Sequence, residues 1–265
     1  MSFFDFASIV LPVMVFVPLE RLLADRPTQP VFRRAWFTDV TYVLVNRPLI
    51  QLGLAAIIAI VTAEARGLVP LRVHTALASQ PMWLQLVQIF LIADLGFYVA
   101  HRAFHTVPGL WRFHAIHHSI EHLDWLAAAR VHPIDQIVTK AFSLLPAFIL
   151  GYSDASLAVF AVLYFWHSLL LHSNVRIGFG PLNWIVASPR FHQWHHANDR
   201  TAYDKNFAAQ LSIIDRLFGT YYVPDHAPAR FGTDDAVPGS YLRNLAYPLR
   251  PPTRSAAART AAASR

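Results

Sequence analysis

The sequence predicts an all-α fold: an integral membrane helical bundle of about four to five membrane helices with a cytoplasmic histidine-rich helical cap. Three observations support this prediction. The 265 residues are 55% hydrophobic and only 14% charged, whereas soluble domains average about 25% charged residues. Several apolar runs approach the length that crosses a bilayer. Arginines stand at the ends of these runs, as in membrane proteins that follow the positive-inside rule.

The same composition excludes several functions. No cysteine is present, so disulfides, thiolate metal sites and thiol catalysis are ruled out, and any metal needs nitrogen or oxygen ligands. The formal net charge is +6. Because the arginines do not form a basic stripe, the charge favours membrane topology, and we expect no nucleic-acid partner.

The first apolar run, Phe3–Leu19, is predicted to be a membrane helix. It lacks the basic start and the small-residue cleavage site of a signal peptide. Two prolines, Pro27 and Pro30, end the helix, and four arginines accompany them: Arg21, Arg26, Arg33 and Arg34. The positive-inside rule places this loop in the cytoplasm and the N-terminus outside.

The second span is predicted over Tyr42–Thr62, with Arg47-Pro48 interrupting it near its cytoplasmic end. A short outer loop follows, which contains His74 as a plain loop residue. The third span, Pro81–Ala100, returns the chain to the cytoplasmic side.

Residues 106–135 are polar, and a helical hairpin of Ile137–Leu150 and Ala155–Leu171 follows them. The hairpin is expected to enter and leave the membrane on the cytoplasmic side. Its short first arm either spans the membrane or is re-entrant. We predict N-terminal membrane helices over 1–84, a central domain over 85–224 and a C-terminal segment over 225–265. The end, Arg250–Arg265, is rich in Pro, Ala, Ser and Arg and is expected to be a disordered tail.

Eight histidines form three ordered clusters with the spacings HX3H, HX2HH and HX2HH. They are His101 and His105; His114, His117 and His118; and His192, His195 and His196. Residues at i, i+3 and i+4 share one face of a helix, so each cluster presents its rings in one direction. A lone buried histidine is usually a hydrogen-bonded core residue. Eight in order instead indicate a metal cage, because neutral imidazole binds Fe, Zn, Cu and Ni.

Asp94 lies about two helical turns before His101 and on the same face. A carboxylate within an apolar run is costly and usually functional. Asp94 either supports a ligand histidine by accepting its ring N–H or pairs with an arginine or hydroxyl elsewhere.

These clusters, their order and their membrane setting resemble the fatty acid hydroxylase and sterol desaturase superfamily. The resemblance extends to the stretches Leu110-Trp-Arg-Phe-His-Ala-Ile-His-His118, Arg130-Val-His-Pro133, His172-Ser-Asn174, Ser188-Pro-Arg-Phe-His-Gln-Trp-His-His196, Asp204-Lys-Asn-Phe207 and Asp215-Arg-Leu-Phe-Gly-Thr220. It covers about residues 85–224, which are therefore expected to form a fatty acid hydroxylase-like catalytic domain.

The resemblance implies a membrane-bound non-haem di-iron oxygenase that uses O2 and electrons to hydroxylate or desaturate a lipid such as a sterol or fatty acyl chain. The implied ligands of two iron ions are His101, His105, His114, His117, His118, His192, His195 and His196, with His172 as a ninth. His132 and His167 are alternatives for a tenth, and His122 is either a ligand or a supporting residue. Zinc is a possible metal in the protein as purified.

No flavin, haem or ferredoxin motif is visible, so a separate reductase or ferredoxin is expected to supply the electrons. The protein is expected to be multi-pass, with its histidine clusters facing the cytoplasm, in the inner membrane if bacterial. The alternative is a metal-binding membrane protein without redox chemistry, either a zinc or iron carrier or an inactive scaffold. A carrier places its ligands near the bilayer midplane, whereas these histidines stand at predicted helix ends, which favours the enzyme.

Overall fold

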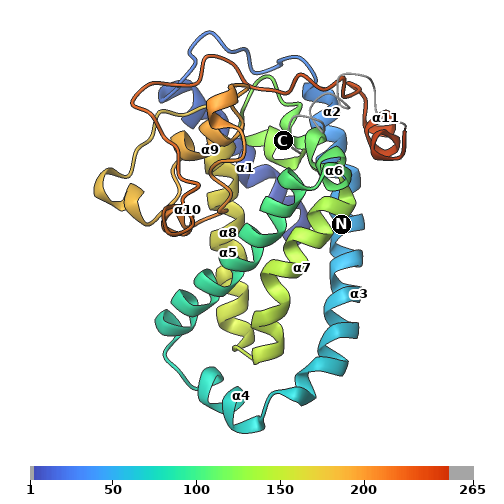
Figure 1. Cartoon of the computed structure of the whole chain (residues 1–265), viewed down its shortest axis with the longest axis vertical. Helices are drawn as coiled ribbons and strands as arrows, with labels where there is room; N and C mark the ends of the chain where they lie inside the picture. Colours follow the sequence, from blue (N-terminus) through green and yellow to red (C-terminus); the bar gives the residue numbers. More distant parts are fainter. Residues whose placement is uncertain (1–2, 251–265) are drawn as a thin grey trace.

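The structure, a computed structural model, describes residues 3–250, with the side chains of residues 9–65 and 67–250. Long helices form an elongated bundle, and short helices and loops gather at its upper end (Figure 1). Within the described range the α-helices are α1 (Phe3–Leu22), α2 (Trp36–Thr41), α3 (Arg47–Ala65), α4 (Leu71–Ala78), α5 (Met82–Thr106), α6 (Pro108–His118), α7 (Pro133–Leu150), α8 (Asp154–His172), α9 (Pro189–His195), α10 (Ser212–Leu217) and α11 (Tyr241–Ala246). These residues form no extended strand; two isolated bridges join Ala24 to Val175 and Ala197 to Phe231.

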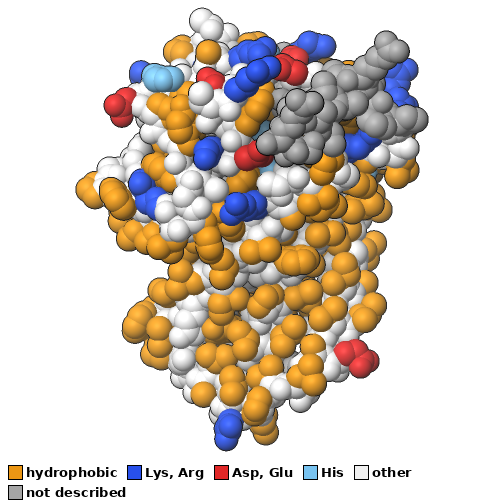
Figure 2. All heavy atoms as spheres, in the orientation of Figure 1, with side chains coloured by type: hydrophobic (Ala, Val, Ile, Leu, Met, Phe, Trp, Pro, Cys, Tyr) orange, Lys and Arg blue, Asp and Glu red, His pale blue; other side chains and the backbone are white. Residues whose placement is uncertain are grey.

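Four helical segments are long and apolar enough to cross a membrane: Trp36–Ala65, Met82–Thr106, Pro133–Leu150 and Asp154–His172. They run side by side along the lower part of the molecule, where α4 joins two of them (Figure 1). Figure 2 shows that this lower part is covered by hydrophobic side chains, whereas most charged side chains lie on the upper part. An extended apolar surface over a helical bundle is stable in lipid, not in water. This confirms the predicted integral membrane bundle.

Close contact between α5 and α7 depends on Gly96. A Cβ atom at this position would clash with the backbone carbonyl of Phe142. Gly151 ends α7 with a left-handed backbone (φ 79°), which glycine adopts without steric cost. The Ser153 hydroxyl then accepts a hydrogen bond from the Ser156 N–H and begins α8. The predicted hairpin is therefore present, with a turn at 151–153.

Three local predictions were wrong. Arg47-Pro48 does not interrupt the second span, because a π-helical segment, Tyr42–Asn46, precedes it and the helix continues to Ala65. A wider π turn accommodates a proline ring that would clash with a regular helical carbonyl. The segment predicted as an outer loop contains a helix, α4. His74 is therefore not a plain loop residue, because it lies on α4 with its Nε2 3.1 Å from the Ile149 carbonyl oxygen.

The first helix, α1, begins at the predicted residue and ends at Leu22, three residues later than predicted. In Figure 1 it lies at the level of the upper half of the bundle. Its Phe16 packs against Trp125 and Trp166, with ring centroids 6.4 and 5.8 Å apart. Whether α1 crosses a membrane stays a prediction. Apart from Arg250, the predicted disordered tail lies outside the described residues.

Candidate metal centre

The first histidine cluster lies at the end of α5, which continues past the predicted span. His101 and His105 are one turn apart, so their rings meet edge to face with centroids 5.0 Å apart. The second cluster forms the last turns of α6. Pro108 begins that helix, because a proline in the first turn needs no N–H partner.

The third cluster occupies α9, a helix of seven residues. Its start is fixed by Ser188, whose hydroxyl accepts from the Phe191 N–H, and by Pro189 in the first turn. His196 follows as the last residue of the turn and is fully buried. Two short helices, α6 and α9, thus carry two of the clusters to the histidines of α5.

The structure brings nine histidines into two groups, in each of which one nitrogen per ring lies within 4.8 Å of the others. The five-histidine group contains His101, His105, His114, His118 and His195, and the four-histidine group contains His117, His172, His192 and His196. Both HX2HH clusters are divided between the groups. Residues at i and i+4 lie about 40° apart on a helix, so His114 and His118 stay together. His117 faces the other group.

Backbone carbonyls and one carboxylate fix the ring orientations. The Nδ1–H donates to an acceptor in five rings: His101 to Phe207 O (2.6 Å), His114 to Asp135 Oδ2 (2.7 Å), His117 to Arg130 O (3.0 Å), His172 to Ser168 O (2.8 Å) and His195 to Lys205 O (2.9 Å). A carbonyl oxygen only accepts, so Nδ1 carries the proton and Nε2 keeps its lone pair. Such partners also orient imidazole ligands in metal sites.

Each group contains a pair of Nε2 lone pairs that face each other. The Nε2 atoms of His101 and His114 are 3.0 Å apart, and those of His117 and His172 are 3.2 Å apart. All four rings carry their proton on Nδ1, so neither pair can form a hydrogen bond while neutral. A cation between the lone pairs satisfies both. The donor set, all neutral imidazole and almost fully buried, therefore fits a metal in each group.

The remaining candidate residues lie outside both groups. His132 starts α7, where its Nδ1 accepts from the Ile134 N–H and its Nε2 lies 3.3 Å from the Leu245 carbonyl oxygen. His167 contacts Gln210 Oε1 (2.6 Å) and the Ala187 carbonyl oxygen (2.9 Å). His122 lines a separate cavity. The structure thus shows no tenth histidine in these groups among residues 3–250.

Asp94 supports the site through the backbone and not through a ligand ring. Its carboxylate accepts from the N–H groups of Ala209, Gln210 and Leu211 at 2.6–3.1 Å. Asp215 accepts from the backbone N–H groups of residues 207 and 208. Two buried carboxylates thus hold segment 207–211, whose first carbonyl accepts from His101.

Sequence reasoning missed the carboxylates that contact the histidines. Asp135, in the first turn of α7, binds His114, and Asp204 lies 3.6 Å from His105 Nδ1. It also missed a buried network of ion pairs, Arg33–Asp39 (2.7 Å), Arg33–Asp124 (2.5 Å) and Arg130–Asp39 (2.5 Å). Asp135 lies two residues after the end of the quoted Arg-Val-His-Pro stretch, which is a usable signal. Two of the three pairs join residues about ninety positions apart, and the sequence offers no signal for them.

Replacing Asp135 by asparagine is expected to weaken metal binding about 10- to 100-fold, the usual cost of losing a partner of a ligand histidine. The amide is a weaker acceptor and permits either tautomer of His114. Metal retention during dialysis against graded chelator concentrations measures the effect. Asp154→Asn, on the exposed first turn of α8, is the control. Equal retention by Asp135→Asn and the unmodified protein would contradict this role.

The metal-free protein is expected to lose stability as the pH falls below about 6.5, the pKa of histidine in an unfolded chain. Burial, reinforced by neighbouring histidines, lowers the pKa of His117, His118, His192 and His196 well below that value. Burial also lowers the pKa of His195 to about 3. The unfolded chain therefore takes up protons first, and each ring costs up to about 1.4 kcal/mol per pH unit.

Thermal unfolding of chelator-treated protein in detergent at pH 7.5 and pH 5.5 tests this expectation. The melting temperature should be clearly lower at pH 5.5. An unchanged melting temperature would show that these rings are not buried in the neutral form.

A helical membrane bundle with nine inward-facing histidines defines a class of membrane protein built to hold metal ions. Comparison with known proteins identifies the family. Residues 86–220 match the model of the fatty acid hydroxylase family. The chain is 33% identical over 248 residues to ornithine lipid hydroxylase OlsE of Rhizobium tropici, covering 89% of this chain and 73% of that protein.

Two further relatives share only part of their length. Human alkylglycerol monooxygenase is 38% identical over 135 residues, covering 50% of this chain and 29% of the relative. Very-long-chain aldehyde decarbonylase GL1-8 of rice (Oryza sativa subsp. japonica) is 27% identical over 159 residues, covering 58% of this chain and 56% of the relative. No solved structure matches significantly.

The chain belongs to the fatty acid hydroxylase family. This confirms the predicted resemblance and the predicted class, a membrane-bound lipid oxygenase, over the carrier and scaffold alternatives.

Proposed function

We propose that this protein is a di-iron oxygenase that uses O2 to hydroxylate a membrane lipid. The five-histidine group would hold one iron ion and the four-histidine group the other. The observation that carries this proposal is the pair of facing Nε2 lone pairs in each group. Each pair needs its own cation. Membership of the family favours iron among the metals that imidazole accepts.

Bound iron would supply O2 activation and so break an unactivated C–H bond, which side-chain acid–base chemistry cannot do. The protein's residues have three tasks. The Nδ1 partners hold the imidazoles in one tautomer and orientation. Burial excludes water from the reacting centre. The ends of α5 and α8 set the histidines where apolar helices meet the polar cap, so a lipid in the bilayer lies close to them.

Ornithine lipid is the first substrate class to test, because the ornithine lipid hydroxylase that matches 89% of this chain is named for it. Hydroxylation is favoured over desaturation, since both of the more identical relatives are named as a hydroxylase and a monooxygenase. We propose a separate one-electron protein donor, a reductase or ferredoxin. We place the histidine cap at the cytoplasmic face, because the arginine-rich segment 21–34 lies at the same end.

The test uses iron-loaded protein in nanodiscs containing ornithine lipid, with a chemical reductant and ¹⁸O2. Mass spectrometry should find one ¹⁸O atom per product lipid, and no product without O2 or reductant. Parallel nanodiscs with an alkylglycerol lipid and with a sterol identify the substrate class. Iron-loaded protein that labels none of these lipids would contradict the proposal.

A further inference from the structure

Trp111 occupies a special position beside the five-histidine group. Its ring centroid lies 5.3 Å from that of His105, 5.4 Å from that of His118 and 6.3 Å from that of His114. Within the described residues, the other non-histidine rings on this group belong to Phe97, Phe104 and Phe207. In the part of the chain that the structure describes, no aromatic ring other than histidine contacts the four-histidine group. Tryptophan is the one readily oxidised side chain among these four rings.

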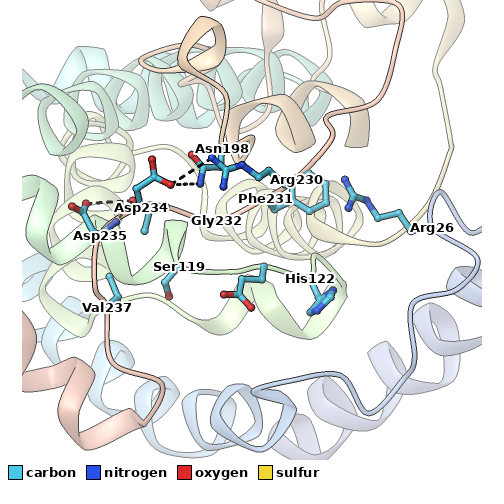
Figure 3. A pocket seen from close by; sticks show the side chains of 12 residues that line it. Arg26, Ser119, His122, Asn198, Arg230, Phe231, Gly232, Asp234, Asp235 and Val237 are labelled. Carbon is cyan, nitrogen blue, oxygen red and sulfur yellow. Dashed lines mark hydrogen bonds and ion pairs between the residues drawn. The ribbon is translucent and has the colours of Figure 1, made fainter. Parts of the chain in front are cut away.

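The opposite edge of the indole reaches a polar cavity. The Trp111 Nε1–H donates to Asp235 Oδ2 at 2.7 Å, and the Thr233 hydroxyl donates to the same oxygen at 3.3 Å. Both Asp235 and Thr233 line a cavity of about 410 Å³. Figure 3 shows Asp235 at one side of this cavity, with Arg26 at the other.

The cavity lies between the histidine groups and the surface. Its wall includes Ser119, the residue after His118, and Asn198, two residues after His196. The side chains of Arg230 and Asp234, which also line it, are 66% and 62% exposed. A partner at the surface of the cap therefore comes close to Asp235, and through it to the indole.

We infer that Trp111, supported by Asp235, is the relay by which electrons from the protein donor reach the metal centre. The inference rests on the proposed function, because it requires a redox metal in the five-histidine group. Each electron would tunnel from the one-electron donor to the metal centre through the indole, which shortens the gap and undergoes no net change, while the Nε1–H bond to Asp235 holds the ring in place. Two such transfers deliver the two electrons that a hydroxylation consumes. A strong oxidant that withdraws electrons in the opposite direction would instead form an indole radical, whose Nε1 proton moves to the Asp235 carboxylate.

Flash photolysis tests this relay in the iron-loaded, dithionite-reduced full-length protein. Photogenerated tris(bipyridine)ruthenium(III), too bulky to enter the histidine site, withdraws electrons through the same route in reverse. Transient absorption follows oxidation of the metal centre, and freeze-quench electron paramagnetic resonance detects the indole radical. Trp111→Phe should slow oxidation of the centre at least about tenfold, or about 1.4 kcal/mol in barrier, and remove the radical signal.

Two further variants sharpen the result. Asp235→Asn keeps the indole in place but removes the proton acceptor, so it should slow oxidation of the centre while iron content stays unchanged. Trp184→Phe, at a 65% exposed position away from the histidines, should behave as the unmodified protein. Oxidation of iron-loaded Trp111→Phe and Asp235→Asn at the unmodified rate would overturn the relay. Failure of the unmodified protein to bind iron would instead overturn the proposed function.

Discussion

Replacing His195 or His196 by alanine is expected to reduce lipid hydroxylation by more than about 100-fold, since losing a partner of a ligand alone costs 10- to 100-fold. The two residues are adjacent but face different groups. His195→Ala should therefore disrupt the five-histidine group, and His196→Ala the four-histidine group. Each variant should retain about one metal ion per chain in place of two, measured by inductively coupled plasma mass spectrometry.

His226→Ala and His122→Ala are the matched controls for these variants. His226 is exposed, and His122 lines the cavity outside both groups. Both controls should keep full metal content. Unchanged metal content in His195→Ala and His196→Ala would show that the two groups are hydrogen-bonded core and not metal sites.

Replacing Asp39 by asparagine is expected to destabilise the protein by about 3–5 kcal/mol, the usual cost of breaking a buried ion pair. Asp39 is fully buried and pairs with both Arg33 and Arg130. Its loss leaves the Arg130 guanidinium without its carboxylate. For a chain of this size, the melting temperature should fall by roughly 10 °C.

The effect should reach the metal centre, because the Arg130 carbonyl accepts from His117 Nδ1. Asp39→Asn should therefore lose metal from the four-histidine group first. The control is Glu121→Gln, which breaks the Arg34–Glu121 pair, whose side chains are 80% and 55% exposed; exposed pairs contribute only about 0–1 kcal/mol. A melting temperature for Asp39→Asn equal to that of Glu121→Gln would contradict the structural role of the network.

Local patterns in the sequence predicted most of the fold. Long apolar runs and the break at Gly151 define α8 to within one residue, whereas α7 begins four residues earlier and α5 ends six residues later than predicted. Histidine spacing correctly predicted that His101 and His105 share a face of α5. The same prediction was wrong for the two HX2HH clusters, because each is divided between the two groups. Errors arose where a local breaker was overruled, as at Pro48, where a π turn lets the helix continue.

The partners that orient the histidines could not be predicted in the same way. Asp94 was singled out as an unusual intramembrane carboxylate, but neither predicted kind of partner was right, because it accepts from backbone N–H groups at 209–211, about 115 residues later. Arg130 stands in a stretch that resembles the family, yet its partner Asp39 comes from another helix. Such contacts are decided by how helices pack in three dimensions, which spacing along one chain does not encode. The division of each HX2HH cluster between two groups likewise depends on where α8 places His172.

The most direct test of the di-iron account is metal analysis with Mössbauer spectroscopy on protein purified in detergent from cells grown on ⁵⁷Fe. We expect two coupled iron ions per chain that dithionite reduces and O2 reoxidises. The Mössbauer signal of one iron ion should be altered in His195→Ala, and that of the other in His196→Ala. A protein that holds no iron, and that shows no reaction with O2 after anaerobic reconstitution with iron, would contradict the account.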